Sequence, residues 1–457
     1  MPNVPDGPVE PEGLPSDIVD ALFSRLTSFS NLAVAVSGGA DSLCLLVLLA
    51  EWKRRTGWQG SLEILCVDHG LRPESAEEAA FVADCARGEG VPCTILRWSG
   101  QKPASNLQEE ARLARYRLMA QHMRGSGSEA LLLAHHQDDQ AETFLDRLTR
   151  GSGVAGLGGM AADEPNGPEG LRLLRPFLGV AKARLEASLR ARGRTWCTDP
   201  SNSNTRYKRS RLRSILALLE EEGLTAERLS KTAGHMRRAG EALEACLRDL
   251  AEKHLIEHPA GPLKLDRLAY RSMTEEMRLR LLTLMIARVS GATPRPRFRN
   301  LSGLDRMLVR ERPCRLTLGG AVFDARDDVV FCWKEPGRTP PETLVDPEGS
   351  GLWDNRYRYC VSDRRKAHGR QALCLGPLCN APLRSRDVNW PKGWPKAAFH
   401  CAPVVWAGED ILCLPFLVAA SNLGNSCKGD VLDLERLPIQ VKLLGNYLDD
   451  GTVQGEN

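Results

Sequence analysis

The sequence has no pair of cysteines with the spacing C-x-x-C, although 14 cysteines occur among its 457 residues. The closest pair is Cys374 and Cys379. Zinc and iron–sulfur sites normally use tighter pairs, so the spacing argues against both. Cys44 and Cys66 lie inside apolar runs, which is typical of small buried residues in a reducing compartment.

Long hydrophobic runs are missing as well. No apolar run approaches the roughly 18 residues that cross a bilayer, so the sequence predicts no membrane partner. The first 17 residues contain five prolines and four acids but no lysine or arginine, whereas a signal peptide needs a basic region before an apolar one. We therefore expect residues 1–29 to form a disordered leader and the protein to be cytoplasmic.

A strong net charge is the third absence. The 61 basic and 58 acidic residues give a net charge of +3, so any surface for nucleic acid must come from local clusters. The hydrophobic content of 42% and the charged content of 26% are ordinary for a globular protein. The length suggests two or three domains.

What is present is a regular alternation of apolar runs and helical patterns between residues 30 and 150. The apolar runs are 32–36, 62–67, 93–97 and 130–134, and the helical patterns lie near 41–55, 75–89, 106–124 and 139–149. This alternation predicts βαβ units in a parallel sheet that is covered on both faces. Ligands of such sheets bind beyond the carboxyl ends of the strands, where Ser37, Asp68 and His135 lie.

The remaining chain has a mostly helical pattern at 212–292 and a strand-like pattern after about 311. We therefore expect an α/β protein with a parallel-sheet domain at 30–215, a helical domain at 216–310 and a β-rich C-terminal domain at 311–457.

The stretch Ser37-Gly38-Gly39-Ala40-Asp41-Ser42 joins the first apolar run to the next helical pattern. A glycine-rich turn before a helix exposes backbone N–H groups, and the helix N-terminus adds partial positive charge, so the stretch predicts a phosphate cradle. Glycine lets a phosphate approach the backbone closely. Asp41 fits this site when a divalent cation lies between it and the phosphates. The alternative is a plain turn in which serine and aspartate act only as caps.

This motif resembles the pyrophosphate-binding loop of the PP-loop ATP pyrophosphatases (the adenine nucleotide alpha hydrolase-like fold), which split ATP into AMP and pyrophosphate. Five further stretches resemble the tRNA(Ile)-lysidine synthetases in order and spacing: 67–75, 106–119, 134–160, 173–185 and 199–213. The resemblance implies that ATP activates carbon 2 of the wobble cytidine of CAU-anticodon isoleucine tRNA as an adenylate. Free L-lysine then displaces AMP and leaves lysidine.

The resemblance also implies catalytic roles for Asp41, Arg112, His135, Asp138 and Asp139. We expect Asp41 and Asp138 to hold Mg²⁺. A lysine ε-amine has a pKa of about 10.4 and must lose a proton before it attacks, so a carboxylate of this group is the candidate base. The alternatives are that Asp138 caps a helix, that Asp139 stabilises the helix dipole, and that Arg112 lies on a solvated helix face.

The expected ATP-binding residues are Ser37, Gly38, Gly39, Ala40, Asp41 and Ser42, together with Asp68 and His69. Asp68 and His69 follow the second apolar run, where the resemblance implies that the backbone frames the adenine. His69 could equally be a structural histidine.

The resemblance implies that the catalytic domain at 30–215 acts on tRNA, that the helical domain at 216–310 binds tRNA and that the domain at 311–457 contacts it. Two segments of the chain are expected to contact tRNA as well. Residues 150–159 hold five glycines, and residues 206–213 carry five basic residues and no acid. The expected contacts are Arg150, Gly151, Gly153, Arg206, Arg209, Arg211 and Arg213. A flexible surface loop and a solvated charge run are the respective alternatives. Family members often have R-N-R-I-R where this chain has Arg209-Ser210-Arg211-Leu212-Arg213.

Other functions stay open on the sequence alone. A PP-loop tRNA thiolase would normally use reactive cysteines, often as C-x-x-C, and an enzyme like GMP synthetase would bring a glutaminase domain, which we do not find. A non-catalytic tRNA-binding relative would lose Asp41, Asp138 or Asp139 first. The sequence also leaves a homodimer open.

Overall fold

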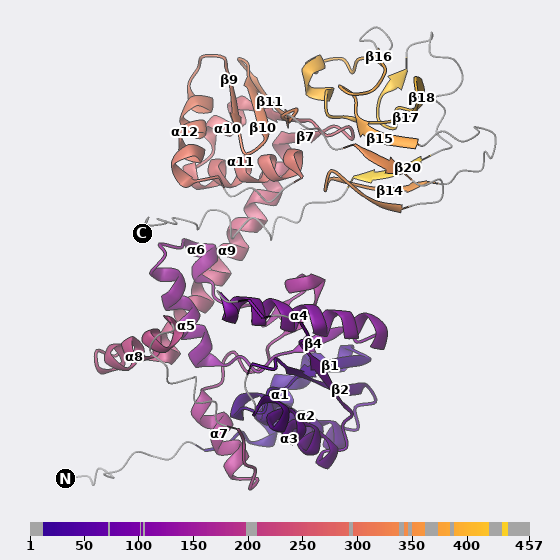
Figure 1. Cartoon of the computed structure of the whole chain (residues 1–457). Coiled ribbons are helices and arrows are strands. Elements are labelled where there is room, and N and C mark those ends of the chain that lie inside the picture. Colours follow the sequence, from indigo (N-terminus) through magenta and orange to yellow (C-terminus); the bar gives the residue numbers. More distant parts are fainter. Residues whose placement is uncertain are drawn as a thin grey trace. The chain divides into compact units, whose positions relative to one another are not determined.

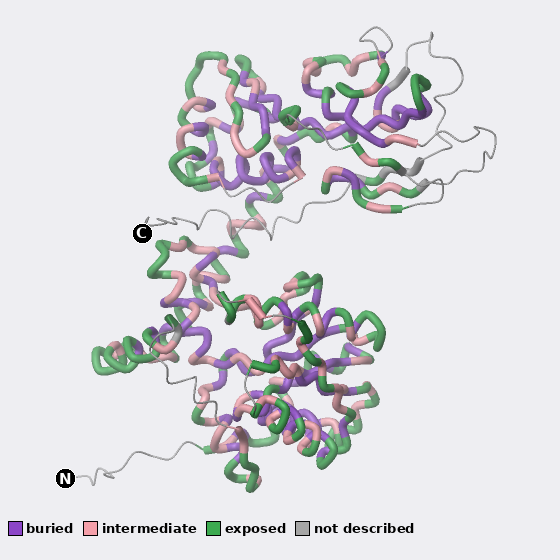
Figure 2. Tube along the Cα trace, in the orientation of Figure 1, coloured by how far each residue is buried: buried purple, intermediate pink, exposed green. Residues whose placement is uncertain are grey.

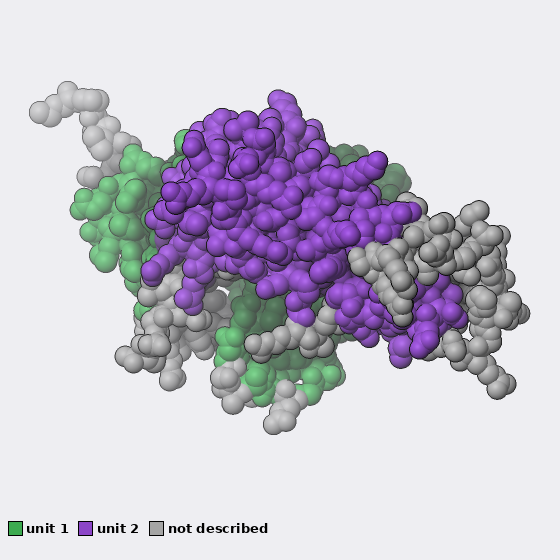
Figure 3. Space-filling model, turned by 90° about the horizontal axis from the view of Figure 1, so that it is seen from above, with its two compact units in different colours: residues 1–149, 157–237 green, residues 150–156, 238–457 purple. Residues whose placement is uncertain are grey.

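The computed structural model describes most of the chain in eleven stretches. These are residues 12–71, 74–100, 102–103, 106–197, 208–291, 296–337, 342–345, 350–361, 373–383, 388–419 and 432–436. The chain forms two compact units, which Figure 3 shows in different colours. Unit 1 comprises residues 1–149 and 157–237, and unit 2 comprises residues 150–156 and 238–457. Among the helices of these stretches, none combines the length and the apolar character that a membrane crossing requires.

Unit 1 is built on a six-stranded sheet with the strand order β3-β2-β1-β4-β6-β5. Its strands β1, β2 and β4 are labelled in Figure 1. The strands are β1 (Asn31–Ala35), β2 (Ser61–Asp68), β3 (Cys93–Arg97), β4 (Ala130–Leu132), β5 (Asp163–Glu164) and β6 (Leu173–Leu174). All neighbouring strands are parallel except β5, which runs antiparallel to β6. The predicted α/β class with a parallel sheet is therefore confirmed.

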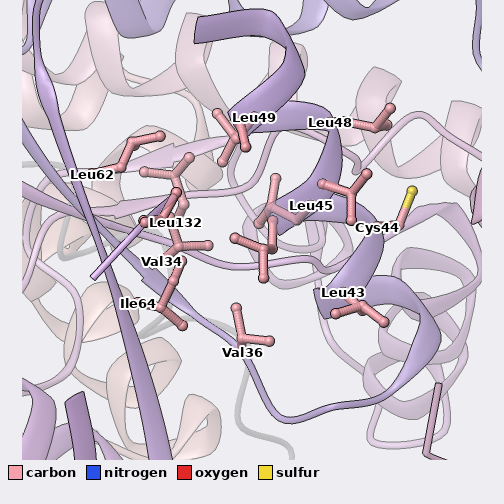
Figure 4. Close-up of a cluster of buried hydrophobic side chains, with 14 of the residues drawn as sticks. Val34, Val36, Leu43, Cys44, Leu45, Leu48, Leu49, Leu62, Ile64 and Leu132 are labelled. Atoms are coloured by element: carbon pink, nitrogen blue, oxygen red, sulfur yellow. The ribbon is translucent and has the colours of Figure 1, made fainter. Parts of the chain in front are cut away.

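The sheet of unit 1 is buried on both faces because side chains alternate along each strand. Leu32 and Val34 of β1 join a core with α2, part of which is drawn in Figure 4. Ala33 joins a second core, on the other face, with α4. Figure 2 shows β1, β2 and β4 as largely buried. The helical elements of this part of the chain are α1 (Ser16–Phe23), η1 (Ser24–Ser28), α2 (Ala40–Thr56), α3 (Ser75–Gly88), α4 (Leu107–Ser126), α5 (Gln137–Leu148), α6 (Val154–Leu157), η2 (Pro168–Gly170), α7 (Lys182–Arg190), α8 (Lys208–Glu221) and α9 (Ala226–His254).

The chain reverses direction across the sheet after β3. Strands β1, β2 and β3 follow one another toward one edge, and β4 then returns to pair with the opposite side of β1. Ligands of open parallel sheets bind at such a switch point, outside the carboxyl ends of the strands. The loops that follow β1 and β4 are therefore brought together for a site.

Unit 2 combines a mixed α and β part with further small sheets. Its strands are β7 (Leu255–Glu257), β8 (Leu263–Asp266), β9 (Cys314–Leu318), β10 (Ala321–Ala325), β11 (Val329–Lys334), β12 (Thr343–Val345), β13 (Ser350–Trp353), β14 (Tyr357–Val361), β15 (Leu373–Pro377), β16 (Val388–Asn389), β17 (Pro403–Ala407), β18 (Asp410–Cys413), β19 (Val418–Ala419) and β20 (Leu432–Arg436). Its helical elements are α10 (Arg267–Ser272), α11 (Glu275–Ser290), α12 (Phe298–Val309) and η5 (Lys396–Phe399).

One hydrophobic core of unit 2 packs the three helices α10, α11 and α12 against an antiparallel sheet of order β7-β8-β11-β10-β9. This core runs from Leu247 to Cys332, so it includes residues on both sides of position 311. The β-rich character predicted for the last part of the chain is confirmed. The disordered leader expected at 1–29 is wrong for residues 16–28, which form α1 and η1. The rest of the division of the chain into domains stays a prediction.

Candidate active site

The loop between β1 and α2 leaves the sheet at the switch point. The N–H of Ser37 donates to Ser42 Oγ at 3.1 Å, and Ser42 Oγ donates to the carbonyl of Gly39, also at 3.1 Å. The carbonyl of Gly38 accepts from the N–H of Cys197 at 2.9 Å. These bonds fix the turn from within. The first N–H groups of α2, which begins at Ala40, have no partners inside a helix and so remain suited to an anion.

A buried histidine faces this loop from the end of β4. His136 is 3% exposed and directly precedes α5. Its Nε2 lies 3.5 Å from Asp41 Oδ2 and 3.4 Å from Asp139 Oδ2, and its Nδ1 lies 3.4 Å from Asp138 Oδ2. We call Asp41, Asp138, Asp139 and His136 the carboxylate cluster.

The charges of the carboxylate cluster balance one another. Burial alone would lower the pKa of His136, but Asp138, Asp41 and Asp139 outweigh burial and raise it to about 10. The imidazolium thus reduces the repulsion among three neighbouring carboxylates. Burial would raise the pKa of Asp138, yet His136 and the backbone N–H of Lys182 hold it below its ordinary value. That N–H donates to Asp138 Oδ2 at 3.0 Å.

The three carboxylates differ in what else they can bind. Asp41 Oδ1 is buried and has no hydrogen-bond partner within the described stretches, and the side chain of Asp138 is 41% exposed. Asp139 is less accessible, and its Oδ2 accepts from the backbone N–H of His136 at 3.0 Å. No group of three or more His, Cys, Asp or Glu side chains is arranged for a metal in the described part of the chain. Because Mg²⁺ usually takes one or two carboxylates together with phosphates, Asp41 and Asp138 still fit this ion.

His135, which the sequence predicts to be catalytic, has a different environment from His136. Its Nδ1 accepts from Nε of Arg175 at 3.3 Å. No role is predicted from the sequence for His136 or Arg175. The only signals for them were the adjacent histidine pair and the resemblance of residues 173–185.

Three further predicted residues have interactions of their own. Asp68 Oδ1 accepts from the hydroxyl of Ser75 at 2.8 Å and from the N–H of Gly70 at 2.9 Å, and the Ser75 bond is the largest cause of its lowered pKa. Burial lowers the pKa of His69, and Arg115 and Lys102 add to this effect. Arg112 is exposed, with its guanidinium 5.2 Å from the ring centre of Tyr116.

The residues expected to contact tRNA fall into three groups. Arg150, Gly151 and Gly153 are exposed, and Arg211 is exposed on α8. Arg213 is bound to the buried carboxylate of Glu142 on α5. Arg206 and the side chain of Arg209 lie outside what the structure describes.

The end of the glycine-rich segment is fastened to α5 by a residue that the sequence analysis missed. The side-chain amide of Gln140 donates to the carbonyl of Met160 at 2.8 Å and accepts from its N–H at 2.7 Å. Gly159 has a φ of +68°, and a Cβ there would lie 2.6 Å from Gln140 Oε1. The left-handed backbone conformation therefore favours glycine at position 159, and a side chain there would also displace the amide of Gln140.

Comparison with known proteins places this geometry in a family context. The family model described as "PP-loop domain" matches residues 16–219. The tRNA(Ile)-lysidine synthase of Ruegeria pomeroyi is 38% identical over 415 residues, which cover 89% of this chain and 94% of that protein. The tRNA(Ile)-lysidine synthase of Methylobacterium sp. (strain 4-46) is 43% identical over 317 residues, which cover 67% of this chain and 90% of that protein. The tRNA(Ile)-lysidine synthase of Wolbachia pipientis wMel is 35% identical over 410 residues, which cover 87% of this chain and 92% of that protein.

Proposed function

This chain belongs to the tRNA(Ile)-lysidine synthase family, and we propose that its reaction takes place at the switch point where the PP-loop meets the carboxylate cluster. The enzyme is an ATP-dependent ligase that forms lysidine in tRNA(Ile), and it uses the ATP-pyrophosphatase chemistry of PP-loop enzymes. The observation that carries the placement is Asp41. It opens the first turn of α2 beside the loop and keeps one buried oxygen without a partner in the described stretches.

The PP-loop binds the phosphates of ATP in this proposal. Gly38, Gly39, Ala40 and Ser42 present backbone N–H groups, and Ser37 presents its hydroxyl, at the N-terminus of a 17-residue helix, where the helix dipole favours an anion. The adenine lies toward Asp68 and His69, at the carboxyl end of β2. Arg112 on α4 contacts the activated nucleotide, because a guanidinium fork suits phosphate oxygens.

Asp41 and Asp138 are the residues that would hold Mg²⁺. When bound, this ion would neutralise part of the phosphate charge beside the two carboxylates. Asp41→Asn should weaken ATP-dependent binding of Mg²⁺, measured by calorimetry with a non-hydrolysable ATP analogue. Asp163→Asn is the matched control, because Asp163 lies in β5 and pairs with Arg172, which directly precedes β6.

Lysine transfer needs a proton acceptor. The free ε-amine of lysine is mostly protonated at neutral pH, and a carboxylate of the cluster takes the proton as the amine attacks the adenylated cytidine of the CAU anticodon. Asp139→Asn should slow lysine transfer more than AMP formation. If Asp139→Asn kept both steps near the wild-type rate, Asp139 would have no such role.

The two basic segments bind the tRNA, and the reaction takes place in the cytoplasm. Arg150, Gly151 and Gly153 form one contact, and Arg206, Arg209, Arg211 and Arg213 form another. The predicted domains at 216–310 and 311–457 add to the tRNA surface, and a homodimer is a further hypothesis. Each phosphate contact that is lost should lower the salt dependence of binding by roughly one unit of slope. A double Arg209→Ala and Arg211→Ala variant with an unchanged slope would contradict this assignment.

The deciding experiment measures the release of AMP from ATP in the presence of Mg²⁺, with tRNA(Ile) and radiolabelled lysine added separately and together. Label should enter the tRNA only when every component is present. AMP release without label transfer would keep the adenylation step and reject lysine as the second substrate. Absence of AMP under all conditions would favour a non-catalytic tRNA-binding protein.

A further inference from the structure

The sheet brings two residues that are forty positions apart in the chain to the same edge. β4 and β6 are parallel neighbours, with Leu131 opposite Leu173 and Leu132 opposite Leu174. The pairing continues one step further, because the N–H of Leu133 donates to the carbonyl of Leu174 at 2.8 Å. His135 and Arg175 follow directly, at the carboxyl ends of these two strands.

Arg175 is a buried cation whose three side-chain nitrogens each have a partner. It is 5% exposed. Its Nε donates to His135 Nδ1 at 3.3 Å, one terminal nitrogen donates to the carbonyl of Ala161 at 2.8 Å, and the other pairs with Glu164 at 2.7 Å. The contacts with Ala161 and Glu164 fix the plane of the guanidinium, so the direction of the Nε–H bond toward His135 is also fixed.

This arrangement determines where His135 carries its proton. A guanidinium only donates hydrogen bonds and does not lose its proton in proteins. His135 Nδ1 is therefore the acceptor and carries no proton. A neutral imidazole with an acceptor at one nitrogen has its N–H at the other, which is Nε2.

We propose that Arg175 is a positioning residue that fixes His135 in the Nε2–H form, so that His135 takes part in the reaction as a hydrogen-bond donor to a phosphate oxygen and not as a base. Nε2 already holds a proton and so cannot accept one from the lysine amine. Nε2 lies across the ring from the Nδ1 that meets Arg175. His135 follows β4, whose parallel neighbour β1 leads into the PP-loop, so the acceptor on this side of the sheet is an anionic phosphate. The proposal rests on the proposed function only for the identity of the acceptor.

The protonation form can be measured without any reaction. Long-range ¹H–¹⁵N correlation spectra of the uniformly labelled full-length protein at neutral pH should show the Nε2–H pattern for His135, assigned by its loss in His135→Gln. Arg175→Met should shift these signals toward a mixture of both forms. Arg172→Met, which removes the neighbouring bidentate pair with Asp163, should leave them unchanged. A protonated ring or an Nδ1–H form in the wild-type protein would overturn the proposal, even if Arg175→Met failed to fold.

Kinetics then separate a donor from a base. The amide nitrogen of glutamine can replace His Nε2, whereas that of asparagine lies closer to the position of Nδ1. AMP formation at saturating ATP should therefore fall less than about tenfold in His135→Gln and about 10- to 100-fold in His135→Asn and Arg175→Met, the range typical for the loss of a supporting contact. Equal losses in the glutamine and asparagine variants would refute the donor role.

A structural role of Arg175 is tested by its other partner. Glu164→Gln weakens the ion pair but keeps the Nε bond, so it should lower the thermal midpoint while the His135 signals stay in place. If Glu164→Gln reduced AMP formation as much as Arg175→Met, Arg175 would act through folding alone. Wild-type protein that makes no AMP would reject the proposed function, while the spectra would still decide the form of His135.

Discussion

The two glycines of the PP-loop should respond differently to alanine, because they have different backbone conformations. Gly38 has a φ of +87°, and a Cβ there would lie 3.4 Å from Cys197 Sγ and from Val82 Cγ2. Gly39 has φ −71° and ψ 160°, an ordinary extended conformation. A Cβ at Gly39 would come no closer than 3.9 Å to any neighbour, namely Ser37 Oγ.

Gly38→Ala should therefore be a stability variant. The space is sufficient, but the left-handed conformation costs an alanine about 1–2 kcal/mol. In a unit of this size each kcal/mol corresponds to about 2–4 °C in thermal midpoint. Differential scanning calorimetry or circular dichroism would measure the shift.

Gly39→Ala should be an activity variant without loss of stability. Alanine tolerates this conformation and restricts the unfolded chain, so the free energy of unfolding should stay constant or rise by about 0.4–1 kcal/mol. If ATP phosphates pack against this backbone, the methyl group displaces them. The loss of one charge-assisted hydrogen bond, about 1.5–3 kcal/mol, corresponds to roughly a 10- to 100-fold loss in kcat/KM for ATP. A Gly39→Ala variant with unchanged kcat/KM for ATP would refute the cradle, since nothing in the protein alone requires glycine there.

Three further predictions concern stability and thiol chemistry. Arg267 is fully buried and donates to the carbonyls of Leu308, Arg310, Arg312 and Arg326. Arg267→Met should therefore lower the free energy of unfolding of unit 2, measured by urea titration, by at least about 3 kcal/mol, because each buried acceptor left without a donor costs about 1–3 kcal/mol. An equal loss in the exposed control Arg326→Met would contradict this. Burial would raise the pKa of Glu63, but hydrogen bonds from Ser126, Ser128 and His122 hold it below its ordinary value. This carboxylate therefore stabilises the fold at pH values above the unfolded-state pKa of about 4.3. The difference in free energy of unfolding between wild type and Glu63→Gln should shrink as the pH falls from 7 through the lowered pKa of the folded state. A difference that grows toward acid pH would contradict the prediction. Burial raises the pKa of Cys44 and of Cys66 to about 12, so a disulfide reagent at pH 8 should label the exposed Cys246 and Cys360 long before these two, as peptide mapping would show.

The strands and helices of the parallel sheet could be predicted from the sequence because each has a distinct period. The apolar run at 32–36 became β1 (Asn31–Ala35), and the helical pattern near 106–124 became α4 (Leu107–Ser126). The motif was found for the same reason, since its position after a strand and before a helix is a local property. Sequence was weaker in the middle of the chain, where β7 and β8 interrupt a mostly helical pattern. Their pairing with each other and of β8 with β11 is a long-range contact, and no local pattern could reveal it.

The roles of the two adjacent histidines show the limit of local patterns most clearly. The chain is extended after β4, and His136 has φ −124° and ψ −175°, so consecutive side chains project to opposite sides. One of the pair must then meet Arg175 at the end of β6, and the other must meet Asp41 at the start of α2. Which residue does which depends on where β4 stops, and a shift of one residue would exchange them. The sequence shows the pair but not this register, so it could not show that His136 is the histidine that meets Asp41.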